Sequence, residues 1–440
     1  MIVMYLSKYK LKQIILFFLL VLPIYQDSPL SKYFGAAGYY ILMPLSIVLI
    51  VLYFLIYHRF PLNKTFNKIL KLGLWLVIIS FVFMFFLLLN GERLVAVGEF
   101  LPLKAIKVLL QFFSYLAYIA LIIILGRKIE MEFLLKCTFF SLILITFICI
   151  IEVNQIPYAF ENLHSAAVFP YWRVRLLGLE ASTTATLVIT YSGLSFFYCL
   201  EKKNTICSII TLVCTITIMV FSQSKTLLVY PIIFGVIFSA LMIKKINTRT
   251  ILYFFFELII AVLFSKFLFP KLSDSISTDL ESYTSTATRV YTSLIGLIVG
   301  CVYPVGVGCS AYLIVLQDYL AKGLFILKYF PFKVNTFEIY SLINKTTDEA
   351  LTVKSGIFHF NMYWGIIGTI YLFKVFVDLT KEIKESNLKQ KLFLIALFWT
   401  EIIGLLSNNF TFEFWLLVAL LILIGEKNMS ESIDVEKKRK

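Results

Sequence analysis

The feature that most constrains this chain is a series of long apolar runs that charged residues rarely interrupt. The run at 37–57, for example, contains no Asp, Glu, Lys or Arg. A helix needs about 20 mostly apolar residues to cross the hydrocarbon core of a membrane, and only helices and closed barrels satisfy their own backbone hydrogen bonds there. Because membrane barrels alternate apolar and polar residues and these runs do not, the sequence predicts membrane-spanning helices.

The composition excludes a soluble globular protein of this size. Of the 440 residues, 60% are hydrophobic and only 15% are charged, whereas soluble chains carry about 25% charged residues. The net charge of +14 would suit a nucleic-acid partner. Excess Lys and Arg also gather, however, in the short cytoplasmic loops of helical membrane proteins, so the position of these residues decides between the two explanations.

We expect an all-α polytopic membrane protein with about 12 transmembrane helices. The boundaries of apolar runs are uncertain by about four residues, since flanking residues often extend a helix. The runs lie near 11–25, 37–57, 70–90, 105–125, 133–152, 181–200, 206–222, 226–242, 250–268, 357–378, 392–408 and 412–425.

The connecting segments alternate between basic and nearly uncharged. Basic residues cluster in one set, which includes 59–71, 244–249 and 437–440, whereas 407–410 in the other set has none. The positive-inside rule places the basic set in the cytoplasm, and an even number of helices then places both termini there. The positive charge is thus explained by topology, and we expect no nucleic-acid partner.

This topology divides the chain into four parts. Residues 1–270 hold helices 1–9, 271–354 form a large outward loop, 355–425 hold helices 10–12, and 426–440 form a charged cytoplasmic tail that we expect to be disordered. An extra crossing within the loop would put the Lys-rich C-terminus outside. We therefore expect the apolar stretches of the loop to form amphipathic helices at the membrane surface.

Two arginines stand on the side where positive charge is disfavoured. Arg173 and Arg175 lie in the outward segment that precedes the sixth helix. Arginine presents planar, permanently charged donors that match a phosphate group, so one interpretation is a clamp for phosphate or diphosphate. The other is that both side chains reach lipid headgroups. Position alone does not separate the two interpretations.

Two further cations could belong to the same clamp. Lys225 follows Ser222-Gln-Ser in a tight outward turn, and Arg289 joins the polar and apolar parts of the large loop. The plainer alternatives are a surface lysine and an arginine that solvates an amphipathic helix.

His359 and Asn361 lie where the tenth helix leaves the outward loop. A histidine at this position could act as a general base or donate a hydrogen bond to a substrate, and the asparagine could contact the same substrate. The alternative is a histidine that only bridges two helices. The chain has no phosphate-binding glycine loop and no HExxH motif, so we expect neither a metal nor a cofactor.

Five short motifs, taken together in order, resemble the Wzy-type O-antigen and capsule polysaccharide polymerases of the O-antigen ligase-like superfamily. Each motif is weak alone, and the set spans residues 172–368. Arg175-Leu-Leu-Gly178-Leu-Glu180 is similar to an Arg-x-x-Gly segment followed by Glu, although the usual Pro is absent. The others are Ser222-Gln-Ser-Lys225, with Lys in place of the family's Arg, Arg289-x10-Gly300, Pro304-Val-Gly306-Val-Gly308, and His359-x-Asn361 followed by Gly365-Ile-Ile-Gly368.

The resemblance implies an enzyme of the bacterial cytoplasmic (inner) membrane that joins oligosaccharide repeats carried on undecaprenyl diphosphate. Arg173, Arg175, Arg289 and Lys225 would then hold the diphosphate, without a metal or cofactor. His359 or Glu180 would remove the proton of the acceptor hydroxyl, with Asn361 as a further substrate contact. Membrane lipid, a flippase and a chain-length regulator would be its partners.

Three other functions remain open from the sequence. A glycan ligase would use the same donor and is barely separable from a polymerase. A lipid-linked oligosaccharide flippase would more often show internal repeats and charged residues within its helices. A membrane O-acyltransferase could use an intramembrane histidine, but it would leave the outward arginines without a purpose.

Overall fold

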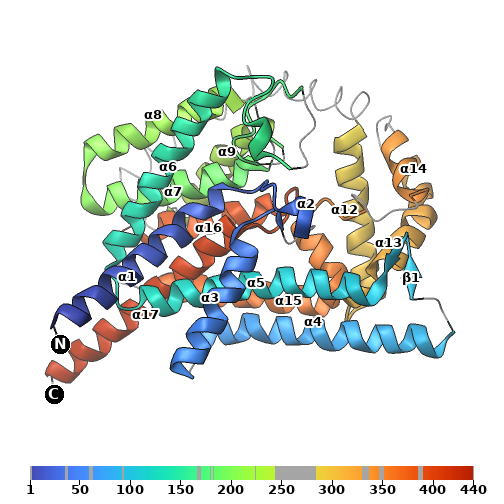
Figure 1. Ribbon diagram of the computed structural model, residues 1–440, viewed down its shortest axis with the longest axis horizontal. Coiled ribbons are helices and arrows are strands. Elements are labelled where there is room, and N and C mark those ends of the chain that lie inside the picture. Colours follow the sequence, from blue (N-terminus) through green and yellow to red (C-terminus); the bar gives the residue numbers. More distant parts are fainter. Residues whose placement is uncertain are drawn as a thin grey trace.

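The computed structural model describes residues 2–34, 38–58, 63–91, 94–165, 170–178, 180–181, 183–222, 224–242, 284–329, 336–345, 351–384 and 390–439, and all structural statements concern these residues. Apart from a small antiparallel pair, β1 (Val95–Ala96) and β2 (Glu99–Phe100), the regular elements are helices (Figure 1). The helices are α1 (Ile2–Val21), α2 (Ser31–Phe34), α3 (Leu42–Tyr57), α4 (Lys64–Leu89), α5 (Leu101–Gly126), α6 (Met131–Val153), α7 (Thr184–Lys202), α8 (Thr205–Ser222), α9 (Lys225–Met242), α12 (Thr284–Val302), α13 (Gly308–Lys322), α14 (Phe337–Ile343), α15 (Gly356–Lys384), α16 (Lys391–Gly404) and α17 (Phe412–Arg439).

The helical membrane character predicted from the sequence is confirmed. Within the described residues, six helices are long and apolar enough to cross a membrane: α4, α5, α6, α8, α15, and α13 with its 3₁₀ extension to Tyr329. Eleven of the twelve apolar runs lie on helices, and the run at 250–268 falls outside the described residues. The total of about 12 transmembrane helices stays a prediction.

Burial separates a central helix from peripheral ones. Every residue of α17 from Phe412 to Gly425 is buried, as expected for a helix that is apolar on all sides and packed within a bundle. In contrast, α4 leaves Phe81, Phe85 and Leu89 exposed. Because these residues are apolar, we assign that face of α4 to lipid.

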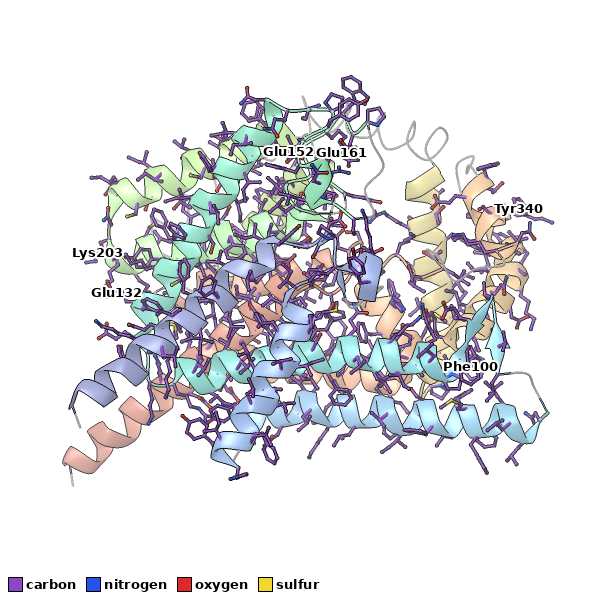
Figure 2. All side chains as sticks on the ribbon, in the orientation of Figure 1. Phe100, Glu132, Glu152, Glu161, Lys203 and Tyr340 are labelled. Atoms are coloured by element: carbon purple, nitrogen blue, oxygen red, sulfur yellow. The ribbon has the colours of Figure 1, made fainter. Side chains whose placement is uncertain are left out.

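The helices have two distinct ends. The basic end is where α5 and α7 end and α4, α6 and α16 begin, and Arg127, Glu132, Lys202 and Glu426 lie there. Figure 2 shows Glu132 and Lys203 at this end and Glu152 at the opposite end of α6. Both chain termini lie toward the basic end. The arrangement agrees with the expected alternation of loops, while the cytoplasmic location of this end stays a prediction.

The two helices of the predicted outward loop contact the helix bundle through the segment that joins them. The segment Pro304–Gly308 between α12 and α13 contacts the middle of α4, where Trp75 Nε1 donates to Val305 O at 3.3 Å and Ser80 Oγ accepts from Cys309 N at 2.8 Å. We had expected both helices to lie on the membrane surface. The surface position of the two helices stays a prediction, and the glycines of the junction allow a close backbone approach that a side chain would block.

The same junction occupies a break in α15. Gly365 has φ +70° and ψ 180°, a conformation open essentially only to glycine, and it interrupts the helical hydrogen bonds. The junction replaces them: Val307 N donates to Met362 O at 2.9 Å, and Ile367 N donates to Pro304 O at 3.1 Å. Irregular backbone within a membrane protein needs such internal partners.

The C-terminal tail also differs from the prediction. Helix α17 continues to Arg439, whereas we expected disorder from Glu426 onward. Arg127 holds Glu426 through two hydrogen bonds, Nε to Oε2 at 2.8 Å and Nη2 to Oε1 at 2.6 Å. This anchor and the good helix-forming Glu and Lys residues of the tail explain the continuation.

Candidate functional site

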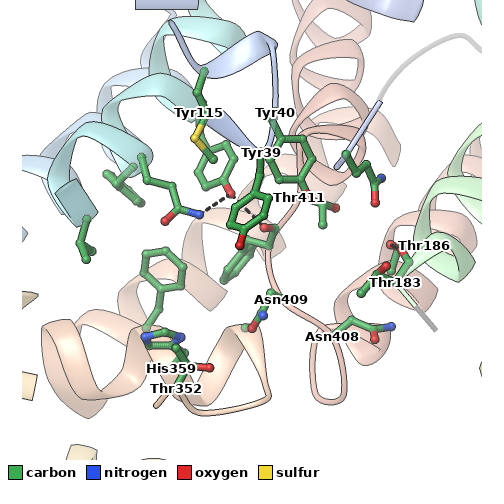
Figure 3. Close-up of a pocket in the computed structure, with 18 of the residues that line it drawn as sticks. Tyr39, Tyr40, Tyr115, Thr183, Thr186, Thr352, His359, Asn408, Asn409 and Thr411 are labelled. Atoms are coloured by element: carbon green, nitrogen blue, oxygen red, sulfur yellow. Dashed lines mark hydrogen bonds between the residues drawn. The ribbon is translucent and has the colours of Figure 1, made fainter. Parts of the chain in front are cut away.

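A cavity of about 300 Å³ opens at the end of the bundle opposite the basic end. Its walls come from α5, α7, α15, the segment before α3, and the connection between α16 and α17 (Figure 3). Its lining combines the aromatic residues Tyr39, Tyr40, Phe112, Tyr115, Phe360, Tyr363 and Phe410 with the polar residues Gln26, Gln111, Thr183, Thr186, Thr352, His359, Asn408, Asn409 and Thr411.

The α16–α17 connection forms one wall and is held from several sides. Gly356 N donates to Asn408 O at 2.8 Å, Tyr115 Oη donates to Phe410 O at 3.1 Å, and Asn408 Nδ2 donates to Tyr230 Oη at 3.2 Å. A Cβ on Gly356 would lie 2.9 Å from Asn408 O, so only glycine allows this approach. The wall is therefore preorganised by tertiary contacts.

His359 lines this cavity from the first turn of α15. Its Nε2 lies 2.6 Å from Tyr363 Oη, one helical turn further along. When Nε2–H donates to that oxygen, Nδ1 is left with the lone pair of a neutral imidazole. The ring of Tyr312 also packs against His359, with centroids 5.8 Å apart. The structure thus gives His359 a partner that could fix its tautomer.

Glu180 and Arg289 meet at the rim of the cavity. Arg289 Nη2 lies 3.3 Å from Glu180 Oε2, and Arg289 Nη1 donates to Ser407 O at 2.9 Å. Ser407 precedes the cavity-lining Asn408, and the cavity-lining Thr183 donates through Oγ1 to Glu180 O at 2.8 Å. Two residues 109 positions apart in the sequence are therefore brought together next to the cavity that contains His359.

Arg175 lies against protein and does not line the cavity. Its side chain is 1% exposed, and its guanidinium carbon lies 4.4 Å from the centroid of the Tyr171 ring. The Glu152 carboxylate accepts from the backbone N–H groups of Arg175 and Leu176 at 2.9 and 2.7 Å. Burial lowers the pKa of Arg175, an effect that Tyr171 and Glu152 oppose.

Of the remaining predicted residues, Arg173 and Asn361 are not among those that line the cavity. Arg173 is exposed, and the side chain of Lys225 falls outside the described atoms. Asn361 is buried between helices, where Nδ2 donates to Gly296 O at 3.0 Å and Oδ1 accepts from Thr369 Oγ1 at 2.9 Å. A Cβ on Gly300 would lie 1.8 Å from Asn361 Nδ2, so Gly300 and Asn361 together pack α12 onto α15.

Several buried acids at this end were missed by the sequence reasoning. Glu413 Oε1 accepts from Gln26 Nε2 at 3.1 Å and from Thr186 Oγ1 at 3.0 Å, and both donors line the cavity. Glu401 Oε1 accepts from Thr190 Oγ1 at 3.0 Å. The available signal was an acidic residue within an apolar run, which is costly and therefore informative.

A further acid, Asp27, ties together two segments at this end of the bundle. Asp27 Oδ2 lies 2.9 Å from His164 Nδ1, and Asp27 Oδ1 accepts from Ser165 Oγ at 2.6 Å. Burial raises the pKa of Asp27, but the hydrogen bonds of His164 and Ser165 lower it by more. The pKa of Asp27 therefore lies below its usual value. This pair fixes the segment that carries Gln26 into the cavity wall.

Comparison with known proteins gives one informative similarity. The chain matches no protein-family model. It is 24% identical over 162 residues to an uncharacterized 49.5 kDa protein in the cps region of Klebsiella pneumoniae, and the match covers 37% of this chain and 38% of that protein. The chain thus aligns with well under half the length of this relative, and the relative's role comes to this chain only as a proposal.

The arrangement can bind a polar ligand with flat apolar faces and transfer a proton. Aromatic side chains and amides in one cavity suit a ligand that has both apolar surfaces and many hydroxyl groups. In the part of the chain that the structure describes, no three His, Cys, Asp or Glu side chains lie together as a metal site would need. The chemistry available among these residues is a histidine in the cavity with a cation at its rim.

Proposed function

We propose that this protein is a polysaccharide polymerase that joins oligosaccharide repeats carried on undecaprenyl diphosphate at the outer face of the bacterial cytoplasmic membrane. The observation that carries the proposal is the cavity that contains His359 and has Arg289 at its rim, at the end of the bundle opposite the basic loops. With the basic loops in the cytoplasm, the cavity would face outward.

The similarity to a protein in a cps region supports a capsule-related role. The match is to an uncharacterized protein, so it supports only the broad role. The proposed reaction rests on the residues of the candidate site. The order of motifs that resembles the O-antigen and capsule polymerases supports the same class. Within this proposal, membrane lipid, a flippase and a chain-length regulator are the expected partners.

The proposed reaction balances with the groups in the cavity. The bond between the anomeric carbon of the donor glycan and its diphosphate breaks, and a bond to the acceptor hydroxyl oxygen forms. The hydroxyl proton passes to His359, and the lipid diphosphate leaves as an anion that Arg289 stabilises. Tyr363 would hold His359 in the tautomer that accepts this proton.

The experiment replaces His359 in a strain deleted for this gene. With matched membrane expression, we expect the His359→Gln variant to lose polymer by about 100-fold or more, the usual contribution of a general base, and to leave single repeats. The matched control is His58→Asn at the left-handed end of α3, away from the cavity. Wild-type chain length in the deletion strain would refute a polymerase, and full activity of His359→Gln would refute the role of His359.

Transport of the lipid-linked oligosaccharide is the second candidate, favoured by two observations. Transporters often have broken helices near their substrate sites, and α15 is broken at Gly365. They also carry ionisable residues within helices, as Glu401 is here. In the deletion strain, single repeats that reach a lectin added outside spheroplasts would indicate a missing polymerase, whereas repeats hidden from the lectin would indicate a missing flippase.

Ligation of a finished glycan uses the same donor chemistry and forms the alternative within the enzyme class. A ligase deletion leaves long chains on their lipid carrier, whereas a polymerase deletion leaves single repeats. The length distribution of the glycan in lipid extracts therefore separates the two.

A further inference from the structure

The rim of the cavity holds a second cation that the sequence motifs do not include, Lys354. Residues 351–354 alternate in burial: Leu351 and Val353 are fully buried, while Thr352 and Lys354 are partly exposed. Thr352 lines the cavity, and Lys354 follows it two residues later along the chain.

The backbone of Lys354 is fixed beside Arg289. Lys354 N donates to Thr292 Oγ1 at 3.3 Å, and Thr292 Oγ1 in turn donates to Arg289 O at 3.3 Å, one helical turn away. Burial lowers the pKa of Lys354; Glu338 and Glu180 oppose this shift, and Arg289 adds to it. Its ammonium group has no hydrogen bond or ion pair with the described residues. A half-buried ammonium next to a guanidinium favours an anion between them.

Arg289 and Glu180 differ in how firmly they are held. The side chain of Glu180 is 59% exposed and that of Arg289 is 27% exposed, and Arg289 is anchored by Ser407 O. A carboxylate this exposed can turn into solvent at little cost, because an exposed ion pair is worth about 1 kcal/mol or less. The arginine would stay in place when the carboxylate leaves.

We infer that Glu180 is an internal placeholder for a phosphate group: it holds Arg289 while the site is empty, and a phosphate-bearing ligand displaces it and binds between Arg289 and Lys354. This inference rests on the proposed function, in which the ligand is a lipid diphosphate. It changes the role of Glu180 from a general base to a competitor of the substrate, and it adds Lys354 as a binding residue.

The test is calorimetric titration of the purified full-length protein with farnesyl diphosphate, and with farnesol and inorganic diphosphate as reference ligands. Loss of one charge-assisted hydrogen bond in Lys354→Gln weakens farnesyl diphosphate binding about tenfold. Removal of the competing charge in Glu180→Gln tightens binding about threefold. The matched control is Lys322→Gln, an exposed lysine of the same outward segment that pairs with Asp318, and it changes binding less than about twofold.

A double variant shows whether Glu180 acts through Arg289. In the Arg289→Gln background, Glu180→Gln tightens binding less than it does in the wild-type background, because most of the competition takes place at that guanidinium. Competition by inorganic diphosphate would show that the anion itself is recognised, and failure to compete would assign recognition to the lipid diphosphate as a whole; both support the site. Farnesol binding as strong as that of farnesyl diphosphate would overturn it.

The inference and the proposed function fail differently. Wild-type affinity in Lys354→Gln, or weaker binding in Glu180→Gln, overturns the inference even if the deletion strain lacks polymer. Unchanged glycan length in the deletion strain overturns the polymerase, whatever the titrations show.

Discussion

The buried acids of the cavity end are held differently from the acids of the basic end. At the basic end, carboxylates pair with cations at partly exposed positions, as in the Arg127–Glu426 and Lys68–Asp378 pairs, each at 2.6 Å. At the cavity end, Glu152 and Glu413 are buried and accept hydrogen bonds from backbone amides, Gln26 or Thr186.

This difference indicates at which end the acidic residues hold the backbone segments in place. Exposed ion pairs contribute little to stability because solvent and salt screen them. Water cannot replace a buried carboxylate that accepts hydrogen bonds from neutral donors, and removing the carboxylate leaves those donors unsatisfied. The buried acids of the cavity end therefore fix the segments that form the cavity, whereas the acids of the basic end mainly pair with the cations there.

The largest expected difference between the ends comes from two Gly→Ala substitutions. At Gly365, φ is +70° and an added Cβ would lie 2.1 Å from Pro304 O. We expect Gly365→Ala to lower the free energy of unfolding by about 3 kcal/mol, from backbone strain and overpacking together. Thermal unfolding of the purified protein in detergent measures this.

Gly425 provides the matched control near the basic end. A Cβ there would meet Glu382 at 3.6 Å or more, an ordinary contact, and alanine favours a helix. Gly425→Ala should therefore leave stability unchanged or raise it slightly. Equal destabilisation by the two substitutions would contradict the role assigned to the break in α15.

The next effect distinguishes the shape of Glu413 from its charge. We expect Glu413→Leu to destabilise the protein by about 2 kcal/mol, because Gln26 and Thr186 lose their acceptor. Glu413→Gln keeps an acceptor oxygen of the same shape and should cost less than about 1 kcal/mol. Unfolding midpoints of the two variants give the comparison; equal costs for Gln and Leu, which both remove the charge, would show that the charge is what matters.

The smallest effect is expected at the basic end. Arg127→Gln should cost about 1 kcal/mol or less, because the side chains of Arg127 and Glu426 are 30% and 21% exposed and the pair is partly screened. The loss should shrink in high salt. A cost above that of Glu413→Leu would reverse the comparison between the ends.

The same pair predicts a pH dependence. Burial raises the pKa of Glu426, but Arg127 and Asn63 lower it more, so its pKa lies below the ordinary value of 4.5. A depressed pKa contributes stability above the unfolded-state value and loses it as the pH falls through the folded-state value. The thermal unfolding midpoint of the wild-type protein should therefore decrease as the pH is lowered below about 4.5. The decrease should be smaller in Arg127→Gln.

The apolar runs located most helices because membrane helices are defined by length and composition, which are local properties. Runs such as 105–125 and 133–152 match α5 and α6 closely. The sequence does not show how distant segments pack against one another. The sequence of 290–330 gives short apolar stretches but does not show that Pro304–Gly308 meets a break in α15.

The candidate site was predicted only in part, for the same reason. Charge on the outward side pointed to Arg175 and Arg289 alike, but a buried position against Tyr171 separates the first from the cavity. Asn361 was predicted to contact the substrate. The sequence could not show that its side chain donates to Gly296 O, because that partner is 65 residues away. Lys354 carried no motif and is identified only by its place beside Arg289.

The sequence by itself determined that this chain is a helical membrane protein, because about 20 apolar residues can reach no other stable state in lipid. It also identified His359 as a candidate base and Arg289 as a candidate ligand of a diphosphate. Only the tertiary structure decided which of these groups share a site. Glu180 and Arg289 come from distant segments, and helix packing brings them together next to the cavity that His359 lines.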